Sequence, residues 1–528
     1  MRASGPLEGS VIVLMDEKSP GPRPWRVAIF RRTVSLSRAS LVVAVAVSAV
    51  VAIDLTAREG IDAGATGHGP AAVAAAPDPP NIVLITTDDQ RADDLHWMPR
   101  TRNRLGRHGI TFRGMLSPHP VCCPARAEIL TGQYGQNNGV LSNGGRFGGY
   151  KRLDVDHTLA TWLSAAGYST AFLGKHLNRY KVAAGRDPGW TRFNPVVHGL
   201  YLYNEFRAWN DGHPEAGRYL TDYLSRKTRR YVRRFASDDS PFFIWTSYVA
   251  PHNSRYRCGK TMCTARPLPA RRHRFLYPRA VPRSFRSAAF NEADVRDKHP
   301  EARDNAKVTR PGVRRFHLAR IRSLAAVDEG VAALIRTLRE TGELDNTVVL
   351  FTSDNGYQMG EHRMLTKNQP FEESLRVPLL VRGPGIRAGE VVRQRVAMVD
   401  LAPTILELAG AEADLVVDGQ SLVRVLQAPG TVRRRGDTQL IQAGPRPGRG
   451  RLWFFRGVRT NRYTYAHYDA ARFRELYDRN RDPWQLRNVA RAPAYRAVVA
   501  ELERRTRRLK VCEGQACNVR FGPMPRPG

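Results

Sequence analysis

Apolar and polar positions alternate along the chain in a pattern that predicts strands and helices in turn. Residues 316–342 place an apolar side chain every three or four positions, which predicts an amphipathic helix closed by Gly342. A second helix is predicted from residue 158 to Gly167, followed directly by a strand. Further short apolar runs predict buried strands within residues 81–90, 241–253, 346–356 and 376–386.

This alternation predicts an α/β fold, with a large, mostly parallel sheet covered by helices on both faces. In such sheets ligands bind beyond the carboxyl ends of the strands. Polar side chains stand at those ends in this chain: Asp88, Asp89, Lys175, His252, Asp354 and Asn355. One such residue alone is an ordinary turn or capping residue. Together they predict one site with oxygen ligands for a hard cation and basic groups for an anionic substrate.

The charge balance is strongly positive. The 528 residues include 83 Lys and Arg against 49 Asp and Glu, a formal charge of +34. Such a surface attracts nucleic acid, anionic lipid or sulfated glycans. No zinc finger, RNA-recognition signature or basic zipper accompanies the charge, so nucleic acid is not expected as a partner. A general arginine bias explains most of these residues.

The N-terminal region predicts export. Residues 41–53 form an apolar run of 13 residues that contains one serine, Ser48, whereas a membrane span needs about 20. The run suits a secretory signal, with a cleavage site near residues 63–65, or else an uncleaved membrane anchor. We therefore expect a secreted or extracytoplasmic protein. The expected organisation is 1–53 signal peptide or membrane anchor, 54–80 linker rich in Ala, Gly and Pro, 81–430 catalytic α/β domain, and 431–528 C-terminal subdomain.

The six cysteines divide into two kinds. Two pairs with one shared spacing favour two disulfides, although the sequence does not choose between local and crossed pairing of Cys258, Cys263, Cys512 and Cys517. Cys122 and Cys123 are neighbours. A disulfide between them would be strained, and no zinc-ligand cluster flanks them. They are either two buried, inert thiols or a site with chemistry of its own.

The segment CCPARAEILTG, which begins at Cys122, resembles the sulfatase signature, Cys-x-Pro-x-Arg followed by Leu-Thr-Gly. TTDDQ, GKHLN, APH, TSDNG, VDLAPTILELAG and ELYDRNRDPWQLRNVA are similar to further sulfatase segments and stand in the same order. The resemblance covers roughly residues 80–490 and looks strongest to the N-acetylglucosamine-6-sulfatase and heparan-type branch. It implies an alkaline-phosphatase-like α/β fold with a small C-terminal antiparallel sheet and helix.

The resemblance also implies a cofactor chemistry. In this family a formylglycine-generating enzyme oxidises the first signature cysteine, here Cys122, to the aldehyde formylglycine (3-oxoalanine). One hydroxyl of the hydrated aldehyde attacks sulfur, and the other lets the sulfate leave. The resemblance implies one divalent cation, Ca²⁺, held by modified Cys122, Asp88, Asp89, Asp354 and Asn355.

Five residues take catalytic roles by the same resemblance. Modified Cys122 is the nucleophile, and Arg126 holds the hydrated aldehyde. Lys175 and Lys367 bind sulfate oxygens, and His252 transfers a proton, including to the leaving alcohol.

Two further histidines stand close to these residues in the chain. Many sulfatases have a catalytic His two residues after the lysine at position 175, but here the histidine comes next. We therefore expect His176 to line the pocket, and His362 has no assigned role.

The function expected from these residues is hydrolysis of a sulfate ester on a sulfated small molecule or glycan. A phosphodiester or phosphonate monoester hydrolase of the same superfamily is one alternative, because some of these enzymes also use formylglycine. A polyanion-binding protein without turnover is the other. Cys122, Arg126, Lys175 and Lys367 all match the family's catalytic positions and argue against that second alternative.

Overall fold

The computed structural model describes residues 79–259, 261–431, 436–446 and 450–528. The strands are β1 Asn81–Thr87, β2 Ile110–Leu116, β3 Ser169–Gly174, β4 Arg192–His198, β5 Phe206–Asn210, β6 His213–Gly217, β7 Phe242–Ser247, β8 Ser254–Cys258, β9 Thr261–Ala265, β10 Thr347–Ser353, β11 Leu379–Arg382, β12 Glu390–Ala397, β13 Thr438–Pro445, β14 Trp453–Thr460, β15 Tyr463–Tyr468 and β16 Phe473–Asp478. The helices are α1 Pro99–Thr101, α2 Cys122–Thr131, α3 Gly135–Asn138, α4 Leu159–Ala165, α5 Leu220–Phe235, α6 Pro300–Arg303, α7 Arg310–Glu340, α8 Glu372–Leu375, α9 Leu401–Ala409, α10 Val423–Gln427 and α11 Arg496–Leu509.

The predicted signal or anchor and nearly all of the predicted linker lie outside the described residues. Among the helices described, none has the length and apolar character that a membrane span requires.

A sheet of ten strands forms the centre of the fold, in the order β12-β2-β11-β10-β1-β7-β3-β4-β5-β6. The five middle strands, from β10 to β4, are parallel to one another. β11 is antiparallel to both of its neighbours, and β5 and β6 form an antiparallel edge. The prediction of a large, mostly parallel sheet is confirmed.

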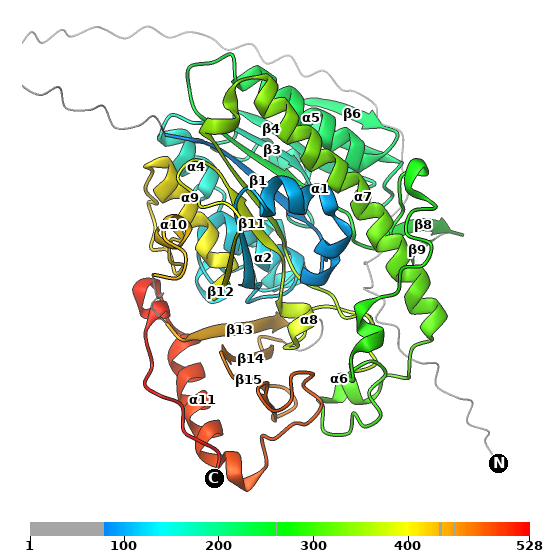
Figure 1. Ribbon diagram of the computed structural model, residues 1–528, viewed down its shortest axis with the longest axis vertical. Coiled ribbons are helices and arrows are strands. Elements are labelled where there is room, and N and C mark those ends of the chain that lie inside the picture. Colours follow the sequence, from blue (N-terminus) through cyan, green and yellow to red (C-terminus); the bar gives the residue numbers. More distant parts are fainter. Residues whose placement is uncertain (1–78, 260, 432–435, 447–449) are drawn as a thin grey trace, which may run out of the picture. The chain divides into compact units, whose positions relative to one another are not determined.

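Helices cover both faces of this sheet (Figure 1). Alternate residues of β1 point to opposite faces. Ile82 and Leu84 pack in the core that includes α2, α4 and α9, whereas Val83 and Ile85 pack in the core that includes α5 and α7. A strand buried on both faces reads as a continuous apolar run, which is why β1 was recognisable in the sequence.

The longest helix, α7, starts six residues before the predicted boundary. Pro311 occupies its first turn, and the Thr309 hydroxyl accepts a hydrogen bond from the Gly312 amide at 3.3 Å. Both features are typical of a helix start. At the other end Gly342 adopts a left-handed φ of 81°, the conformation that closes helices.

The C-terminal part contains the small antiparallel sheet, β13-β14-β15-β16, which packs against α11 (Figure 1). Residues Asp78–Gly528 cluster as one compact unit. A hydrogen bond connects the small sheet to the segment between β2 and α2, because the Gly444 amide in β13 donates to His119 Nε2 at 3.0 Å. The division at residue 430 stays a prediction.

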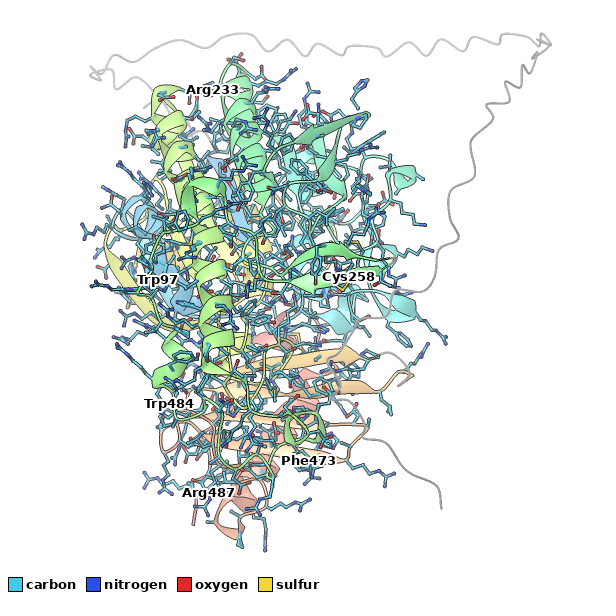
Figure 2. All side chains as sticks on the ribbon, turned by 90° about the vertical axis from the view of Figure 1, so that its right-hand side faces the viewer. Trp97, Arg233, Cys258, Phe473, Trp484 and Arg487 are labelled. Atoms are coloured by element: carbon cyan, nitrogen blue, oxygen red, sulfur yellow. A yellow bond between two sulfur atoms is a disulfide. The ribbon has the colours of Figure 1, made fainter. Side chains whose placement is uncertain are left out.

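The two disulfides pair locally, which resolves the choice that the sequence left open. Cys258 joins Cys263 across the β8–β9 hairpin, and Cys512 joins Cys517 after α11. Figure 2 shows Cys258 on that hairpin, beside α7. Cys122 and Cys123 are free and buried.

Candidate active site

The carboxyl ends of three parallel strands, β1, β10 and β3, bring five of the predicted polar residues to one edge of the sheet. β10, β1, β7 and β3 are consecutive and parallel, so their carboxyl ends lie side by side. Asp88 and Asp89 follow β1, Asp354 and Asn355 follow β10, and Lys175 follows β3. All five side chains are buried.

Asp89 connects the ends of two strands. Its φ of 68° is left-handed, a conformation that Asp tolerates better than most residues. Its amide donates to Asp354 Oδ1 at 3.2 Å, and its own Oδ1 accepts from Asn355 Nδ2 at 2.7 Å. Burial alone would raise the pKa of Asp89, but its basic neighbours, Lys367 foremost, together outweigh burial and keep the pKa well below its ordinary value.

Cys122 is the first residue of α2, and its thiol points into this cluster. Lys367 Nζ donates to Cys122 Sγ at 2.9 Å, and Sγ lies 3.5 Å from Asp88 Oδ1. Burial, reinforced by the Asp88 carboxylate, raises the pKa of the Cys122 thiol to about 11. The unmodified side chain is therefore a protonated thiol at neutral pH and a weak nucleophile.

Cys123 has a different environment, which explains the paired cysteines. Its Sγ accepts a hydrogen bond from the Asn178 amide at 3.0 Å, and its own amide donates to Asn143 Oδ1 at 2.9 Å. It packs in the apolar core with α4 and α9. Burial raises its thiol pKa to about 12. One cysteine therefore faces the polar cluster and the other supports the helix start.

Arg126 lies one helical turn after Cys122 and is fully buried. Its Nε donates to Asp354 Oδ2 at 3.0 Å. Its Nη1 donates to the Lys175 carbonyl at 2.6 Å and to Ser247 Oγ at 2.5 Å. The guanidinium thus connects α2 to the ends of β10, β3 and β7, a use that suits its rigid array of donors.

Two lysines neutralise the carboxylates. Lys175 Nζ donates to Asp88, and Lys367 Nζ donates to Asp89. Burial alone would lower both lysine pKa values, but the acidic groups around each lysine, with its carboxylate partner foremost, together outweigh burial and raise each pKa well above its ordinary value. Both ammonium groups are therefore charged throughout the physiological pH range.

His252 follows β7 and is half-buried beside the same cluster. Its Nε2 lies 3.7 Å from Asp89 Oδ2. Its Nδ1 lies 2.8 Å from the Asn253 carbonyl, which can only accept, so Nδ1 carries the hydrogen. Burial lowers the pKa of His252 to about 3, and the Lys367 charge reinforces this against the pull of Asp89. The ring is neutral, and its nitrogen without a hydrogen, Nε2, faces the cluster.

His176 and His362 each pair with a carboxylate that does not belong to the cluster around Cys122. His176 Nε2 pairs with Asp187 Oδ2 at 2.7 Å, inside a group of aromatic rings that includes Phe172. His362 Nδ1 pairs with Glu292 Oε2 at 2.6 Å. Each histidine thus has a carboxylate partner outside the cluster.

The donor set fits a hard cation. Ligand atoms of Asp88, Asp89, Cys122 and His252 all lie within 4.8 Å of one another. Asn355 adds a buried amide oxygen, Oδ1, that has no hydrogen-bond partner among the described residues. Carboxylate and amide oxygens are the ligands of Ca²⁺ and Mg²⁺. His252 belongs to this group by position, whereas the sequence placed it only in proton transfer.

Sequence reasoning missed three residues at this site. Tyr201, in the β4–β5 connection, stacks on the His252 ring at 4.3 Å and lies 5.4 Å from Lys175 Nζ. No sequence pattern marks it. Ser247 is the last residue of β7, so the strand-end rule could have found it. Arg320 is a charged residue in the apolar stripe of α7, and its Nη2 donates to the Asp89 carbonyl at 2.5 Å.

Comparison with known families gives two matches. The sulfatase family profile matches residues 80–411. A second profile, N-sulphoglucosamine sulphohydrolase C-terminal, matches residues 360–512. Together these matches span both sheets and every residue of the cluster.

Similar proteins carry sulfatase names. An arylsulfatase of Volvox carteri is 33% identical over 85% of this chain and 77% of that protein. A putative extracellular sulfatase Sulf-1 homolog of Caenorhabditis elegans is 30% identical over 70% of this chain, which spans about half, 53%, of that protein. The N-acetylglucosamine-6-sulfatase of Homo sapiens is 29% identical over 85% of this chain and 87% of that protein. This last match bears out the branch that the sequence resembles.

The fold is also similar to a solved structure, a protein in complex with its substrate D-glucosamine-2-N,6-O-disulfate. The TM-score is 0.67 at 23% identity, over 81% of this chain and 97% of that chain. At this identity the likeness concerns the fold. The family profile and the relatives carry the assignment: the chain belongs to the sulfatase family and is a sulfuric ester hydrolase.

Proposed function

We propose that this sulfatase removes a sulfate ester from a sulfated sugar, using a formylglycine formed from Cys122 and one bound divalent cation, Ca²⁺. The human relative is named for N-acetylglucosamine 6-sulfate, and the solved structural neighbour is described with a sulfated glucosamine. Both support a sugar sulfate over a simple aryl sulfate as the natural substrate.

One observation carries the proposal. Lys367 Nζ lies 2.9 Å from Cys122 Sγ and also donates to Asp89, at the edge where the carboxylates converge. Cys122, at the start of α2, thus faces both the Lys367 ammonium and the carboxylates. That environment suits a residue that attacks an anionic substrate far better than it suits an inert core thiol.

Asp88, Asp89, Asp354, Asn355 and modified Cys122 would hold the cation, which would polarise the sulfate and lower the pKa of the attacking hydroxyl. Burial and the neighbouring Asp88 raise the pKa of Asp354, which reflects the repulsion among these carboxylates. A divalent cation would relieve that repulsion. The formylglycine supplies a hydrated aldehyde as the nucleophile, with a second hydroxyl that permits sulfate release.

The chain's own groups then have separate tasks. Lys175 and Lys367 bind sulfate oxygens and stabilise charge that develops on them. Arg126 orients the hydrated side chain of residue 122 from one turn below. His252, whose Nε2 faces the cluster, accepts a proton there and returns it to the leaving alcohol.

We further propose that the protein is exported and that a formylglycine-generating enzyme acts on it. The two local disulfides support an oxidising compartment, and one relative is named as extracellular. The predicted signal or anchor, including residues 41–53, lies outside the described residues. We retain residues 81–430 as the catalytic domain and 431–528 as a subdomain that shapes the substrate cleft.

Mass spectrometry of the tryptic peptide Gly114–Arg126 tests the cofactor. We expect an aldehyde at position 122 that a hydrazide probe captures and that Cys122→Ala lacks. Because some hosts lack the modifying enzyme, the protein is produced with and without a co-expressed formylglycine-generating enzyme. A thiol that persists with that enzyme present would refute the formylglycine mechanism.

Substrate choice is tested on the same preparation. We expect hydrolysis of glucosamine 6-sulfate and of 4-methylumbelliferyl sulfate, each with a kcat/KM above that for a phosphodiester or a phenylphosphonate ester. The reverse order would assign the chain to the phosphonate or phosphodiester hydrolases of the superfamily. Tight, salt-sensitive binding of sulfated glycans without turnover would favour a binding protein.

A further inference from the structure

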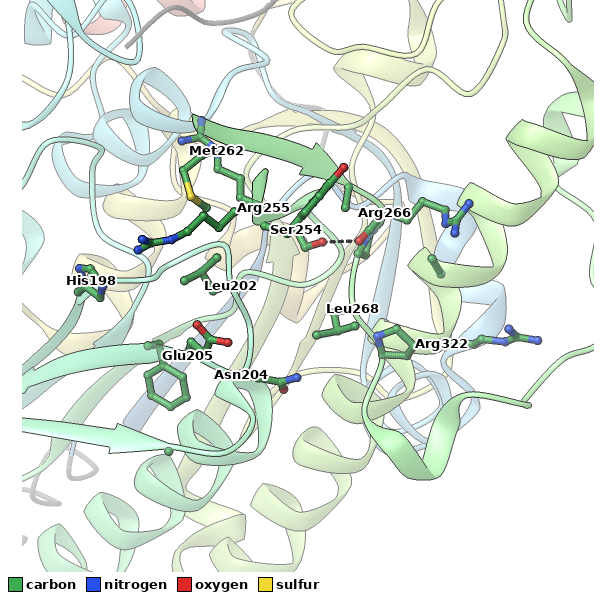
Figure 3. Close-up of a pocket in the computed structure, with 18 of the residues that line it drawn as sticks. His198, Leu202, Asn204, Glu205, Ser254, Arg255, Met262, Arg266, Leu268 and Arg322 are labelled. Carbon is green, nitrogen blue, oxygen red and sulfur yellow. Dashed lines mark hydrogen bonds between the residues drawn. The ribbon is translucent and has the colours of Figure 1, made fainter. Parts of the chain in front are cut away.

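A large hollow opens next to the cluster around Cys122. Its volume is about 1020 Å³. Its walls come from the β4–β5 connection, the β8–β9 hairpin, the segment after β9 and one side of α7 (Figure 3). Figure 3 shows Asn204 and Glu205 on one side of this hollow, Arg255 and Met262 on another, and Arg322 on α7. We call this hollow the arginine hollow.

The lining is strongly basic. Its arginines are Arg207, Arg255, Arg257, Arg266, Arg315 and Arg322, against the single carboxylate of Glu205. Within the described residues, none of these six guanidinium groups forms an ion pair with a carboxylate. Arginine side chains elsewhere in the fold, such as Arg459 and Arg462, do pair with carboxylates. Uncompensated guanidinium groups around a cavity attract oxyanions and bind them through paired donors.

One aromatic ring separates the arginine hollow from the catalytic groups. The Arg255 guanidinium lies 5.4 Å from the Tyr201 ring centre, and Lys175 Nζ lies 5.4 Å from the same centre. The His252 ring stacks on Tyr201 at 4.3 Å. The Arg255 amide also donates to the Tyr201 carbonyl at 2.9 Å. A ligand that reaches residue 122 with one end would therefore have its neighbouring part beside this hollow.

The β8–β9 hairpin fixes two of the arginines. Arg255 and Arg257 are two residues apart on β8, so they share one face of the hairpin. The hairpin belongs to no larger sheet, and an isolated pair of strands is marginally stable. The Cys258–Cys263 disulfide closes it. This disulfide therefore holds the positions of basic groups next to the active site.

We propose that the arginine hollow is a subsite for a second anionic group, a sulfate, on an oligosaccharide whose scissile sulfate lies at residue 122. The substrate is then a multiply sulfated oligosaccharide instead of a monosaccharide. This inference rests on the proposed function, because it places the scissile sulfate at that site. The size of the hollow exceeds that of one sulfate and leaves room for the sugar that carries it.

The test compares binding of a heparin tetrasaccharide and of glucosamine 6-sulfate by isothermal titration calorimetry, with every protein carrying Cys122→Ala so that neither ligand is hydrolysed. The variant is Arg257→Ala/Arg315→Ala, which removes one exposed arginine from β8 and one from α7. We expect the tetrasaccharide Kd to rise roughly tenfold or more, whereas the monosaccharide Kd stays within about twofold. Arg507→Ala/Arg508→Ala removes the same charge from exposed positions on α11 and should leave both Kd values unchanged.

Two further measurements separate the possible failures. Turnover of 4-methylumbelliferyl sulfate tests the proposed function and does not depend on the arginine hollow. If the enzyme that carries formylglycine did not hydrolyse this compound, the proposed function would be refuted. The calorimetry would still decide whether the subsite exists. Equal tetrasaccharide binding by the Cys122→Ala protein with and without the two arginine substitutions would refute the subsite and would not affect the proposed sulfatase function. A single-stranded DNA of matched charge that binds as tightly, and weakens as much in the variant, would show unspecific polyanion binding instead. Arg257→Lys/Arg315→Lys should recover only part of the affinity, because lysine keeps the charge and loses the paired donors.

Discussion

Lys367 Nζ lies 2.9 Å from Cys122 Sγ, although 245 residues separate them in the chain. The same ammonium donates to Asp89, so the Lys367 side chain connects residue 122 to the carboxylate cluster. Lys367→Ala should therefore lower kcat for sulfate hydrolysis by about 10²–10³-fold, because a charge that stabilises the transition state is removed. Stopped assays on 4-methylumbelliferyl sulfate measure this.

The formylglycine content of Lys367→Ala, read from the peptide Gly114–Arg126, should equal that of the wild type. Lys151→Ala, at an exposed position, is the matched control and should retain full activity. Wild-type kcat in Lys367→Ala would exclude this lysine from catalysis.

The two cysteines should differ in their responses to substitution. Cys122→Ala is expected to abolish turnover and leave the fold intact. Cys123→Ala should remain modified at Cys122 and active, but it leaves the Asn178 amide without its sulfur partner. An unsatisfied amide costs about 1–3 kcal/mol when it is fully buried. Asn178 is only partly buried, so the free energy of unfolding should fall by about 1 kcal/mol in urea titrations. An inactive but stable Cys123→Ala protein would contradict this division of roles.

Arg126 should contribute strongly to stability as well as to catalysis. It is fully buried and pairs with buried Asp354, so Arg126→Met leaves an uncompensated carboxylate. Loss of one partner of a buried ion pair costs about 3–5 kcal/mol. Chemical denaturation should show this loss, and the double variant Arg126→Met/Asp354→Asn should recover part of it. If both proteins were equally unstable, the Asp354 charge would not be the cause.

His119 should make the stability of the protein sensitive to acid. It is buried, its Nε2 accepts from the Gly444 amide, and burial lowers its pKa from 6.5 to about 3. As pH falls below about 6.5, His119 binds a proton in the unfolded chain but stays neutral in the folded protein. The free energy of unfolding therefore decreases until pH reaches about 3. At about 1.4 kcal/mol per pKa unit, the loss reaches a few kcal/mol. His119→Gln keeps an acceptor for Gly444 without titrating, so its urea midpoint should depend less on pH in this window. An identical pH dependence in both proteins would refute the role of His119.

Calcium should stabilise the protein through the carboxylate cluster. Three carboxylates, of Asp88, Asp89 and Asp354, converge with the unpartnered Asn355 Oδ1. A ligand that binds only the folded state raises stability by mass action. Excess Ca²⁺ should raise the Tm of the EGTA-treated protein and restore its turnover. Asn355→Leu should weaken the Tm response to Ca²⁺, whereas Asn346→Leu, at an exposed position just before β10, should not.

The sequence alone determined the local elements and the kind of chemistry. Apolar periodicity exposed β1, β10 and α7, because burial on both faces or on one helical stripe leaves a regular pattern. Polar residues directly after apolar runs located Asp88, Lys175 and Asp354. The segment around Cys122 carried the family resemblance. All of these are patterns within short stretches, where geometry follows from spacing.

Only the tertiary structure decided which of these residues meet. The order β10-β1-β7-β3 places Arg126 against Asp354 across 228 residues of sequence, and no local spacing encodes that order. The tertiary structure also separated the roles of the two cysteines, because Cys122 faces the polar cluster and Cys123 faces the apolar core. Tyr201 lies in the β4–β5 connection, whereas the six arginines of the arginine hollow come from β5, β8, the segment after β9 and α7, which lie apart in the sequence. Their proximity depends on the packing of distant segments, which local sequence patterns do not specify.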